Sequence, residues 1–62
     1  MITINLMKDI NNDRAYVEAK NEHKELLFAH MVVTYYKAEN LVREIKKMLE
    51  KLGHSVEVIK NY

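Results

Sequence analysis

The chain contains no cysteine, no proline and no tryptophan, and it has a single glycine. The missing cysteines exclude disulfide bonds and thiolate metal sites, and one glycine cannot make a glycine-rich phosphate loop. The longest apolar run, Leu26 to Val33, is far too short to span a bilayer. The first residues also lack the basic and apolar regions of a signal peptide. We therefore expect a cytoplasmic protein that does not insert into a membrane.

With 62 residues, the chain is long enough for one small domain, residues 1–62. Its apolar content of 48% and charged content of 31% are typical of a folded rather than a disordered chain. The net charge of +1 creates no strong field toward nucleic acid or acidic membranes. Because so small a core contributes little net stability, the chain needs very regular packing or self-association. Its content of asparagine, lysine, isoleucine and tyrosine is compatible with a bacterial or phage source.

The segment from Tyr35 to Leu52 predicts an amphipathic helix. Its apolar residues recur at intervals of three and four, as they do on one face of a helix. They are Ala38, Leu41, Val42, Ile45, Met48, Leu49 and Leu52. Gly53 follows the last of them and predicts the end of the helix, because glycine adopts the left-handed conformation without a steric cost.

Two segments near the N-terminus alternate apolar and polar residues, which predicts two strands. The apolar positions are Ile2, Ile4 and Leu6 within residues 1–9, and Ala15, Val17 and Ala19 within residues 14–20. The turn-forming residues 11–13 (Asn-Asn-Asp) lie between these segments and favour a hairpin. The rival interpretation is that Asn12 or Asp13 caps a helix that begins near Arg14.

Residues 26–33 (LLFAHMVV) are ambiguous because apolar side chains fill nearly every position. As a helix, they would join residues 21–52 into a rod about 48 Å long, which would overhang any sheet and need a partner chain. As a strand, they would form a central strand that is apolar on both faces. Residues 21–23 would then be a turn and Thr34 the helix N-cap. A helix that begins at Tyr35 is about 27 Å long, close to the length of about 23 Å of a seven-residue strand. This match in length favours the strand interpretation of residues 26–33.

Residues 55–60 alternate Val56 and Val58 with Glu57, which predicts a final strand. The predicted fold is a small α+β domain of order strand, strand, strand, helix, strand. Its helix, residues 35–52, packs on an antiparallel-rich sheet. The alternative fold has an N-terminal strand or hairpin, a long helix over residues 21–52 and a C-terminal strand, and it is dimeric.

This element order is similar to the opening half of the ribonuclease H-like fold and to small antitoxins built on a partial version of it. The stretch from Lys37 through Gly53 to Val58 looks like that fold's first helix and fourth strand. Glu39 would match the helix carboxylate of the nuclease family. The resemblance does not extend to nuclease activity, because the strand at residues 2–6 has no aspartate and two-metal chemistry needs several converging carboxylates.

The nucleophilic and metal-ligating residues are not spaced for catalysis. His54 and Ser55 are neighbours on a strand, so their side chains point to opposite faces and cannot pair as base and nucleophile. On a helix, His23 and His30 would lie two turns apart, too far to share a metal ion. His30 is a titratable group inside an apolar run, which makes it a candidate interface residue. We expect no enzymatic activity, no metal site and no cofactor.

The predicted helix carries a candidate anion or nucleic-acid strip, made up of Arg43, Lys46, Lys47 and Lys51. Like charges one helical turn apart repel by a few tenths of a kcal/mol, so a cluster of this kind hints at an anionic ligand. Against this interpretation, glutamates share the same surface. The pairs Glu39–Arg43 and Lys46–Glu50 are also spaced as ion pairs within one helix.

The candidate partner interface consists of Tyr16, Leu27, His30, Met31, Tyr35 and Tyr36. Tyrosine is favoured at interfaces because it buries a large area at a low cost in rotamer freedom. If the helix covers one sheet face, Tyr16, Met7, Leu27 and Met31 would lie on the other. An apolar patch of this kind on so small a domain indicates a partner site.

These observations favour a small regulatory or inhibitory protein that acts by protein–protein binding. It would be a homodimer joined through the uncovered sheet face or an edge strand, with a further protein partner that the sequence does not identify. The alternative is a nucleic-acid-binding repressor that uses the basic strip. Residues 2–6 (Ile-Thr-Ile-Asn-Leu) resemble the opening strand of ribbon-helix-helix repressors, whose polar side chains enter the major groove.

Overall fold

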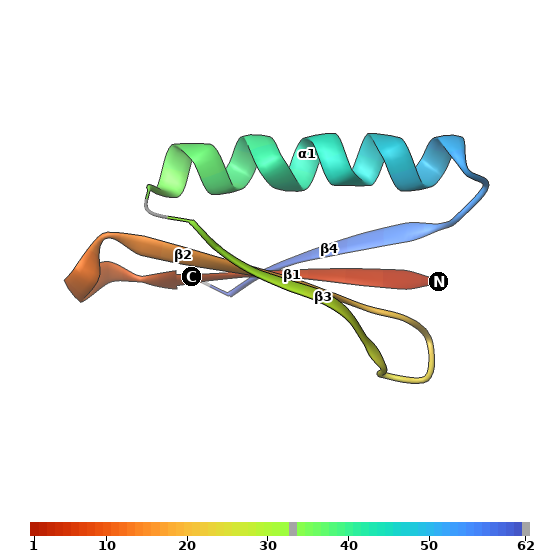
Figure 1. The fold of residues 1–62 in the computed structure, drawn as a ribbon, viewed down its shortest axis with the longest axis horizontal. Coiled ribbons are helices and arrows are strands. Elements are labelled where there is room, and N and C mark those ends of the chain that lie inside the picture. Colours follow the sequence, from red (N-terminus) through yellow and green to blue (C-terminus); the bar gives the residue numbers. More distant parts are fainter. Residues whose placement is uncertain (33, 62) are drawn as a thin grey trace.

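The computed structural model describes residues 1–32 and 34–61, without the side chains of residues 10 and 30–32. Its elements, in chain order, are β1 (Ile2–Asp9), a short 3-10 helix (Ile10–Asn12), β2 (Arg14–Lys20), β3 (Leu26–Val32), α1 (Tyr35–Lys51) and β4 (Val56–Asn61). One helix packs on one face of a four-stranded mixed sheet (Figure 1). The predicted α+β fold is confirmed, and the alternative long helix over residues 21–52 is wrong because residues 26–32 form a strand.

The strands lie in the order β3-β2-β1-β4. β2 pairs antiparallel with both β1 and β3, whereas β4 pairs parallel with β1. The prediction that residues 26–33 form a central strand is therefore wrong, because β3 is an edge strand. Two successive hairpins place β3 outside β2, and α1 then carries the chain across the sheet to the free edge of β1, where β4 completes the sheet.

Asparagine side chains form hydrogen bonds in both hairpin turns, and each turn contains a residue in the left-handed backbone conformation. In the first, Asn12 Nδ2 donates to Asp9 Oδ2 over 2.8 Å, and Asp13 has φ 51°. The rival interpretation of a helix from Arg14 is wrong, since Arg14 begins β2. In the second, Asn21 Oδ1 accepts hydrogen bonds from the backbone N–H groups of residues 23 and 25, at 2.9 and 3.0 Å. This arrangement confirms the predicted turn at residues 21–23.

The core lies between α1 and the two inner strands. It consists of Ile2, Ile4 and Leu6 from β1, Ala15, Val17 and Ala19 from β2, and Ala38 and Val42 from α1. Because the side chains of a strand alternate between faces, the predicted alternation in residues 1–9 and 14–20 is confirmed. The three buried alanines are small enough to let the helix approach the sheet closely.

The ends of α1 follow the predicted signals. Thr34 is the N-cap residue in extended conformation, although its side chain makes no capping hydrogen bond within the described residues. At the other end, Gly53 has φ 93°. The Gly53 N–H donates to the Glu50 carbonyl at 3.0 Å, and the His54 N–H donates to the Leu49 carbonyl at 3.1 Å. This pair of hydrogen bonds is a Schellman motif, which satisfies carbonyls that the helix leaves unpaired.

Candidate functional site

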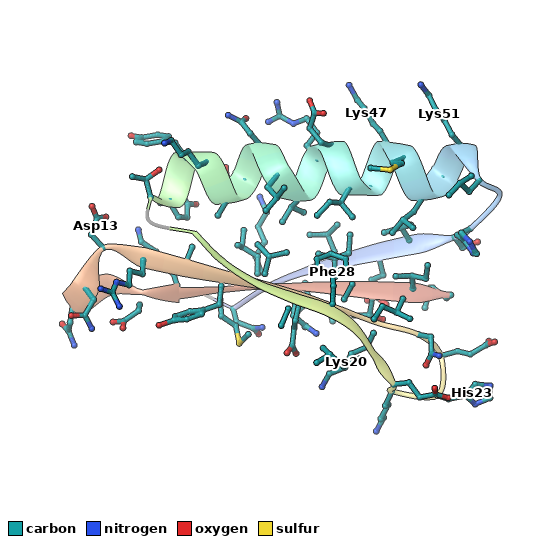
Figure 2. The ribbon with its side chains drawn as sticks, in the orientation of Figure 1. Asp13, Lys20, His23, Phe28, Lys47 and Lys51 are labelled. Carbon is teal, nitrogen blue, oxygen red and sulfur yellow. The ribbon has the colours of Figure 1, made fainter. Side chains whose placement is uncertain are left out.

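An apolar groove follows the β3 side of α1. It has a volume of about 350 Å³ and is lined by Phe28, Ala29, Leu41 and Ile45. Phe28 projects from β3 toward the helix, into the middle of the space between the two elements (Figure 2). The sheet twists β3 away from the C-terminal half of α1 (Figure 1), so the helix does not cover this flank completely. We name this region the β3 groove.

Large apolar side chains extend beyond the β3 groove into solvent. Leu26 and Leu27 at the start of β3 are 56% and 49% exposed. On α1, Met48 and Leu52 are 59% and 70% exposed. They follow Leu41 at helical spacing, which places them on the same flank of the helix. The apolar surface therefore continues from the groove along the helix, whereas Leu27, the neighbour of Phe28 on β3, adds exposed apolar area on the other face of the strand.

The backbone of β3 has no partner along its outer edge within the described residues. The strand sequence, LLFAHMV, contains no Lys, Arg, Asp, Glu or Pro. Proteins usually protect exposed edges with charged residues or proline, because an open edge pairs readily with another strand. The opposite edge strand, β4, does carry such charges at Glu57 and Lys60. The two edges of the sheet therefore differ in chemistry.

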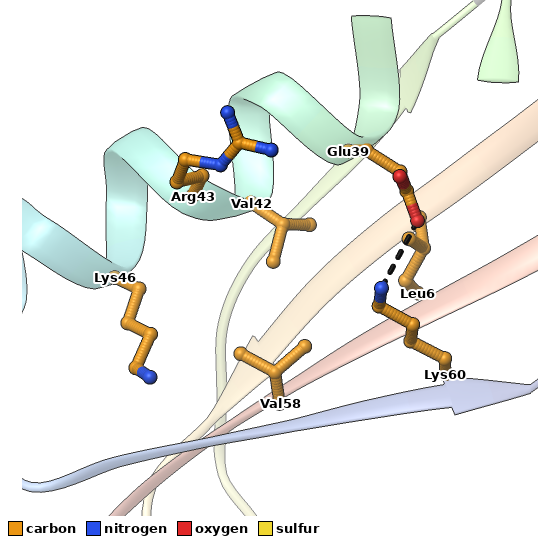
Figure 3. A pocket seen from close by; sticks show the side chains of 7 residues that line it. All are labelled: Leu6, Glu39, Val42, Arg43, Lys46, Val58 and Lys60. Atoms are coloured by element: carbon orange, nitrogen blue, oxygen red, sulfur yellow. Dashed lines mark hydrogen bonds and ion pairs between the residues drawn. The ribbon is translucent and has the colours of Figure 1, made fainter. Parts of the chain in front are cut away.

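A second groove lies between α1 and β4, and we name it the β4 groove (Figure 3). It has a volume of about 220 Å³, an apolar floor and a charged rim. The floor consists of Leu6, Val42 and Val58, and the rim of Glu39, Arg43, Lys46 and Lys60. Lys60 Nζ lies 3.1 Å from Glu39 Oε1, and the Tyr35 hydroxyl donates to the same oxygen over 3.2 Å. These two contacts hold the Glu39 carboxylate at one end of the groove.

The side chains of the candidate basic strip point to two different sides of α1. Arg43 and Lys46 line the β4 groove, whereas Lys47 and Lys51 project away from the sheet into solvent (Figure 2). In the described part of the chain, neither Arg43 nor Lys46 is in a salt bridge. The ion pairs expected from helical spacing, Glu39–Arg43 and Lys46–Glu50, are not formed there. Instead, Glu39 reaches across the groove to Lys60 on β4.

Part of the candidate partner interface lies on the uncovered face of the sheet. Tyr16 is half-buried on β2, where it pairs with Met7 on one side and with Met31 on the other. Leu27 belongs to β3 and is exposed. The same face also carries polar residues, including a Lys20–Glu18 ion pair at 3.5 Å. The uncovered face is therefore mixed in character, and the apolar residues on it are interrupted by charges.

The other tyrosines of the candidate interface lie at the start of α1. Their rings contact edge to face, with centroids 6.0 Å apart, and Tyr36 is 81% exposed. Lys8 Nζ lies 4.1 Å from the centre of the Tyr35 ring, a cation–π contact. The structure thus places Tyr35 and Tyr36 apart from Tyr16 and Leu27. His30 pairs with Val17 and Met31 with Tyr16 along the backbone, but both side chains lie outside the described part of the chain, so their proposed interface roles stay predictions.

The sequence reasoning missed two features of these sites. Phe28 was not singled out, although its place between exposed Leu27 and Ala29 marks the covered face of β3. Lys60 was not included in the basic strip, although Val56, Val58 and Lys60 occupy alternate positions of one strand. That alternation places Lys60 on the face that α1 covers. The alternation of residues along β4 could therefore have predicted that Lys60 lies near the helix.

Comparisons with known proteins found no matching family model, no similar curated protein and no similar solved structure. Among the described residues, no three metal-ligating side chains lie close enough to hold an ion. Within the same residues, α1 is neither long enough nor apolar enough to cross a membrane. In the described part of the chain, the β3 groove, the β4 groove and the two strand edges of unlike chemistry are the features from which we infer a function.

Proposed function

We propose that this chain is a non-enzymatic regulatory or inhibitory protein of the cytoplasm that acts by protein–protein binding as a homodimer. The observation that carries the proposal is the uncharged edge of β3 beside the β3 groove, which has no partner among the described residues. Strand edges bind other chains through backbone hydrogen bonds, and neighbouring apolar pockets add affinity and specificity. Both elements are present on this side of the molecule.

A second copy of the chain fits this edge because identical strands can pair antiparallel about a two-fold axis. Such an interface is self-complementary, since each copy offers the same surface to the other. An axis perpendicular to the sheet would keep both helices on one side and extend the sheet to twice its width. The two β3 grooves would then face each other across the axis. The exposed side chains of Leu26, Leu27 and Met48 would lie near the contact.

The chain is small enough to gain substantially from such an interface. Among the described side chains, eight apolar residues are buried in the core, and large side chains on the β3 side lie in solvent. Burial of apolar surface contributes about 25 cal/mol per Å², and a single fully buried leucine about 1.5–3 kcal/mol. Self-association would therefore add stability comparable to that of several core residues.

Sedimentation equilibrium over a series of protein concentrations tests the dimer. The wild-type chain is expected to sediment as a dimer, and Leu27→Lys to weaken self-association at least about tenfold, because a lysine at the edge repels its copy and resists burial. Ile59→Lys is the matched control. It introduces the same charge at an exposed aliphatic position on the other edge strand, where Ile59 is 38% exposed.

The control is expected to leave the dimer intact, and circular dichroism would verify that both variants remain folded. A wild-type chain that stays monomeric at high concentration would contradict the proposal. An Ile59→Lys variant that dissociates as fully as Leu27→Lys would show that the contact does not use the β3 edge.

A nucleic-acid-binding repressor is the second candidate, and it is supported by Lys47 and Lys51, which project into solvent from one side of α1 (Figure 2). The position of β1 is unfavourable for the ribbon-helix-helix type, because β1 lies between β2 and β4 and has no free edge within the described residues. Binding of duplex DNA that falls steeply with salt and is lost in Arg43→Glu plus Lys47→Glu would favour this candidate.

A further inference from the structure

The geometry points to the β4 edge as the binding site for an extended, acidic segment of a protein partner. The segment would add to β4 as a further strand and direct its acidic side chains toward Arg43 and Lys46. This inference rests on the proposed function, because it assigns a protein ligand. It uses the edge of the sheet opposite to the one that we assign to self-association.

The backbone of β4 offers the necessary hydrogen-bonding groups. In the described part of the chain, β4 pairs with β1 alone, so its outer edge is open. An added strand would lie about 4.8 Å beyond β4. Its side chains would alternate between the two faces of the sheet, and those on the helix side would enter the β4 groove beside Val58 and Lys60.

The charges of the β4 groove select an acidic ligand. Its rim carries three cations and one carboxylate, and that carboxylate, on Glu39, already contacts Lys60 and Tyr35. Arg43 and Lys46 form no salt bridge within the described residues. Figure 3 shows their charged ends spread apart along the groove rather than converging on one point. Such a spread suits several carboxylates along an extended chain better than one small anion.

A further observation favours a peptide over a nucleic acid. The floor of the groove is apolar, formed by Leu6, Val42 and Val58, and it suits the side chains of a peptide rather than a phosphate backbone. A peptide strand, in contrast, places its acidic side chains along the groove, where their methylene groups pack on this floor, while it pairs with the backbone of β4.

A second copy of this chain does not supply the required charge. Of its two edge strands, β3 carries no acidic residue and β4 carries Glu57 alone. The acidic strand must therefore come from a different protein. The charges of β4 would repel unsuitable strands while they attract a complementary one, as specific interfaces commonly do.

Fluorescence anisotropy with a blocked, labelled peptide that alternates valine and glutamate tests this site. The wild-type chain is expected to bind the peptide with an affinity that falls with salt, and not to bind the same peptide with lysine in place of glutamate. Arg43→Glu plus Lys46→Glu is expected to weaken binding by about tenfold or more. The matched control is Lys47→Glu plus Lys51→Glu, which makes the same change in charge on the outer side of the same helix and is expected to weaken binding only slightly.

Two backbone-methylated peptides test the strand geometry. One carries N-methyl groups on the valines and the other on the glutamates. An added strand pairs through one of its edges, so one of the two peptides is expected to lose binding while the other retains it. Equal loss in the two double variants, or retained binding by both methylated peptides, would overturn the inference. Binding of duplex DNA that competes with the peptide and depends on Arg43 and Lys46 would overturn it as well.

Sedimentation of the same variants separates this inference from the proposed dimer. The Arg43→Glu plus Lys46→Glu variant is expected to remain dimeric, because its substitutions lie on the β4 side. A monomeric wild-type chain that binds the acidic peptide would refute the dimer and support the β4 site. A dimeric chain that does not bind the peptide would refute the β4 site and leave the dimer in place.

Discussion

At the end of α1, the contribution of the Gly53 backbone conformation to the free energy of unfolding can be measured separately from side-chain contacts. Gly53 has φ 93°, and a Cβ atom built on it would meet no heavy atom within 4 Å. Gly53→Ala therefore introduces no clash and removes no contact. Any change in the free energy of unfolding would come from the backbone conformation and from the greater stiffness of the unfolded chain.

The expected loss follows from two opposing effects. The left-handed conformation costs a residue with a Cβ about 1–2 kcal/mol, whereas the stiffer unfolded chain returns about 0.4–1 kcal/mol. We expect Gly53→Ala to destabilise the fold by about 1 kcal/mol, and the melting temperature to fall by about 4–8 °C for a domain of this size. Gly53→Asn should lose less, because asparagine adopts the left-handed conformation more readily.

Urea and thermal unfolding followed by circular dichroism would measure both variants. The protein concentration must be the same in every sample, because the stability of a dimer depends on it. The reasoning would be refuted if Gly53→Ala were as stable as the wild type. It would also be refuted if Gly53→Asn were less stable than Gly53→Ala, because the order would then not follow left-handed propensity.

Two further substitutions test the core and the second turn. Leu6 is fully buried, so Leu6→Ala should lower the free energy of unfolding by about 2–5 kcal/mol, a large share of the roughly 3–9 kcal/mol expected for a domain of this length. Urea unfolding should show a markedly lower midpoint, and a variant with the midpoint of the wild type would contradict the assigned core. Lys24 has φ 64°, so Lys24→Gly should raise stability by about 0.5–1 kcal/mol, and a lower melting temperature would show that the Lys24 side chain contributes to the turn.

Local pattern was sufficient to predict most of the secondary structure. The alternation around Ile4 and Val17 and the helical spacing from Ala38 onward each reflect a face that must be buried. Gly53 and the Asn-Asn-Asp turn marked ends that only a few residue types can form. Residues 26–33 were ambiguous by pattern because apolar side chains fill nearly every position; the length of the following helix favoured a strand, and the pairing of β3 with β2 confirmed it.

The candidate sites were less predictable because they depend on residues far apart in the chain. Helical spacing favoured Glu39–Arg43 as an ion pair, yet Glu39 pairs with Lys60 on β4. The candidate interface was chosen by residue type, but the structure places Tyr35 and Tyr36 at the start of α1 and Tyr16 on the opposite face of the sheet. The sequence identified residue types that are common at interfaces, but it did not show which of them lie side by side.

The sequence by itself determined β1, β2, α1 and β4, their order along the chain and the side of each that is buried, because these depend on periodicity and on the conformational limits of single residues. Only the tertiary structure decided that β3 and β4 are the edges of the sheet, since strand order depends on how the crossover through α1 closes. That closure leaves an uncharged edge beside Phe28 and a charged edge beside Arg43 and Lys46. The two proposed binding surfaces follow from this difference between the edges.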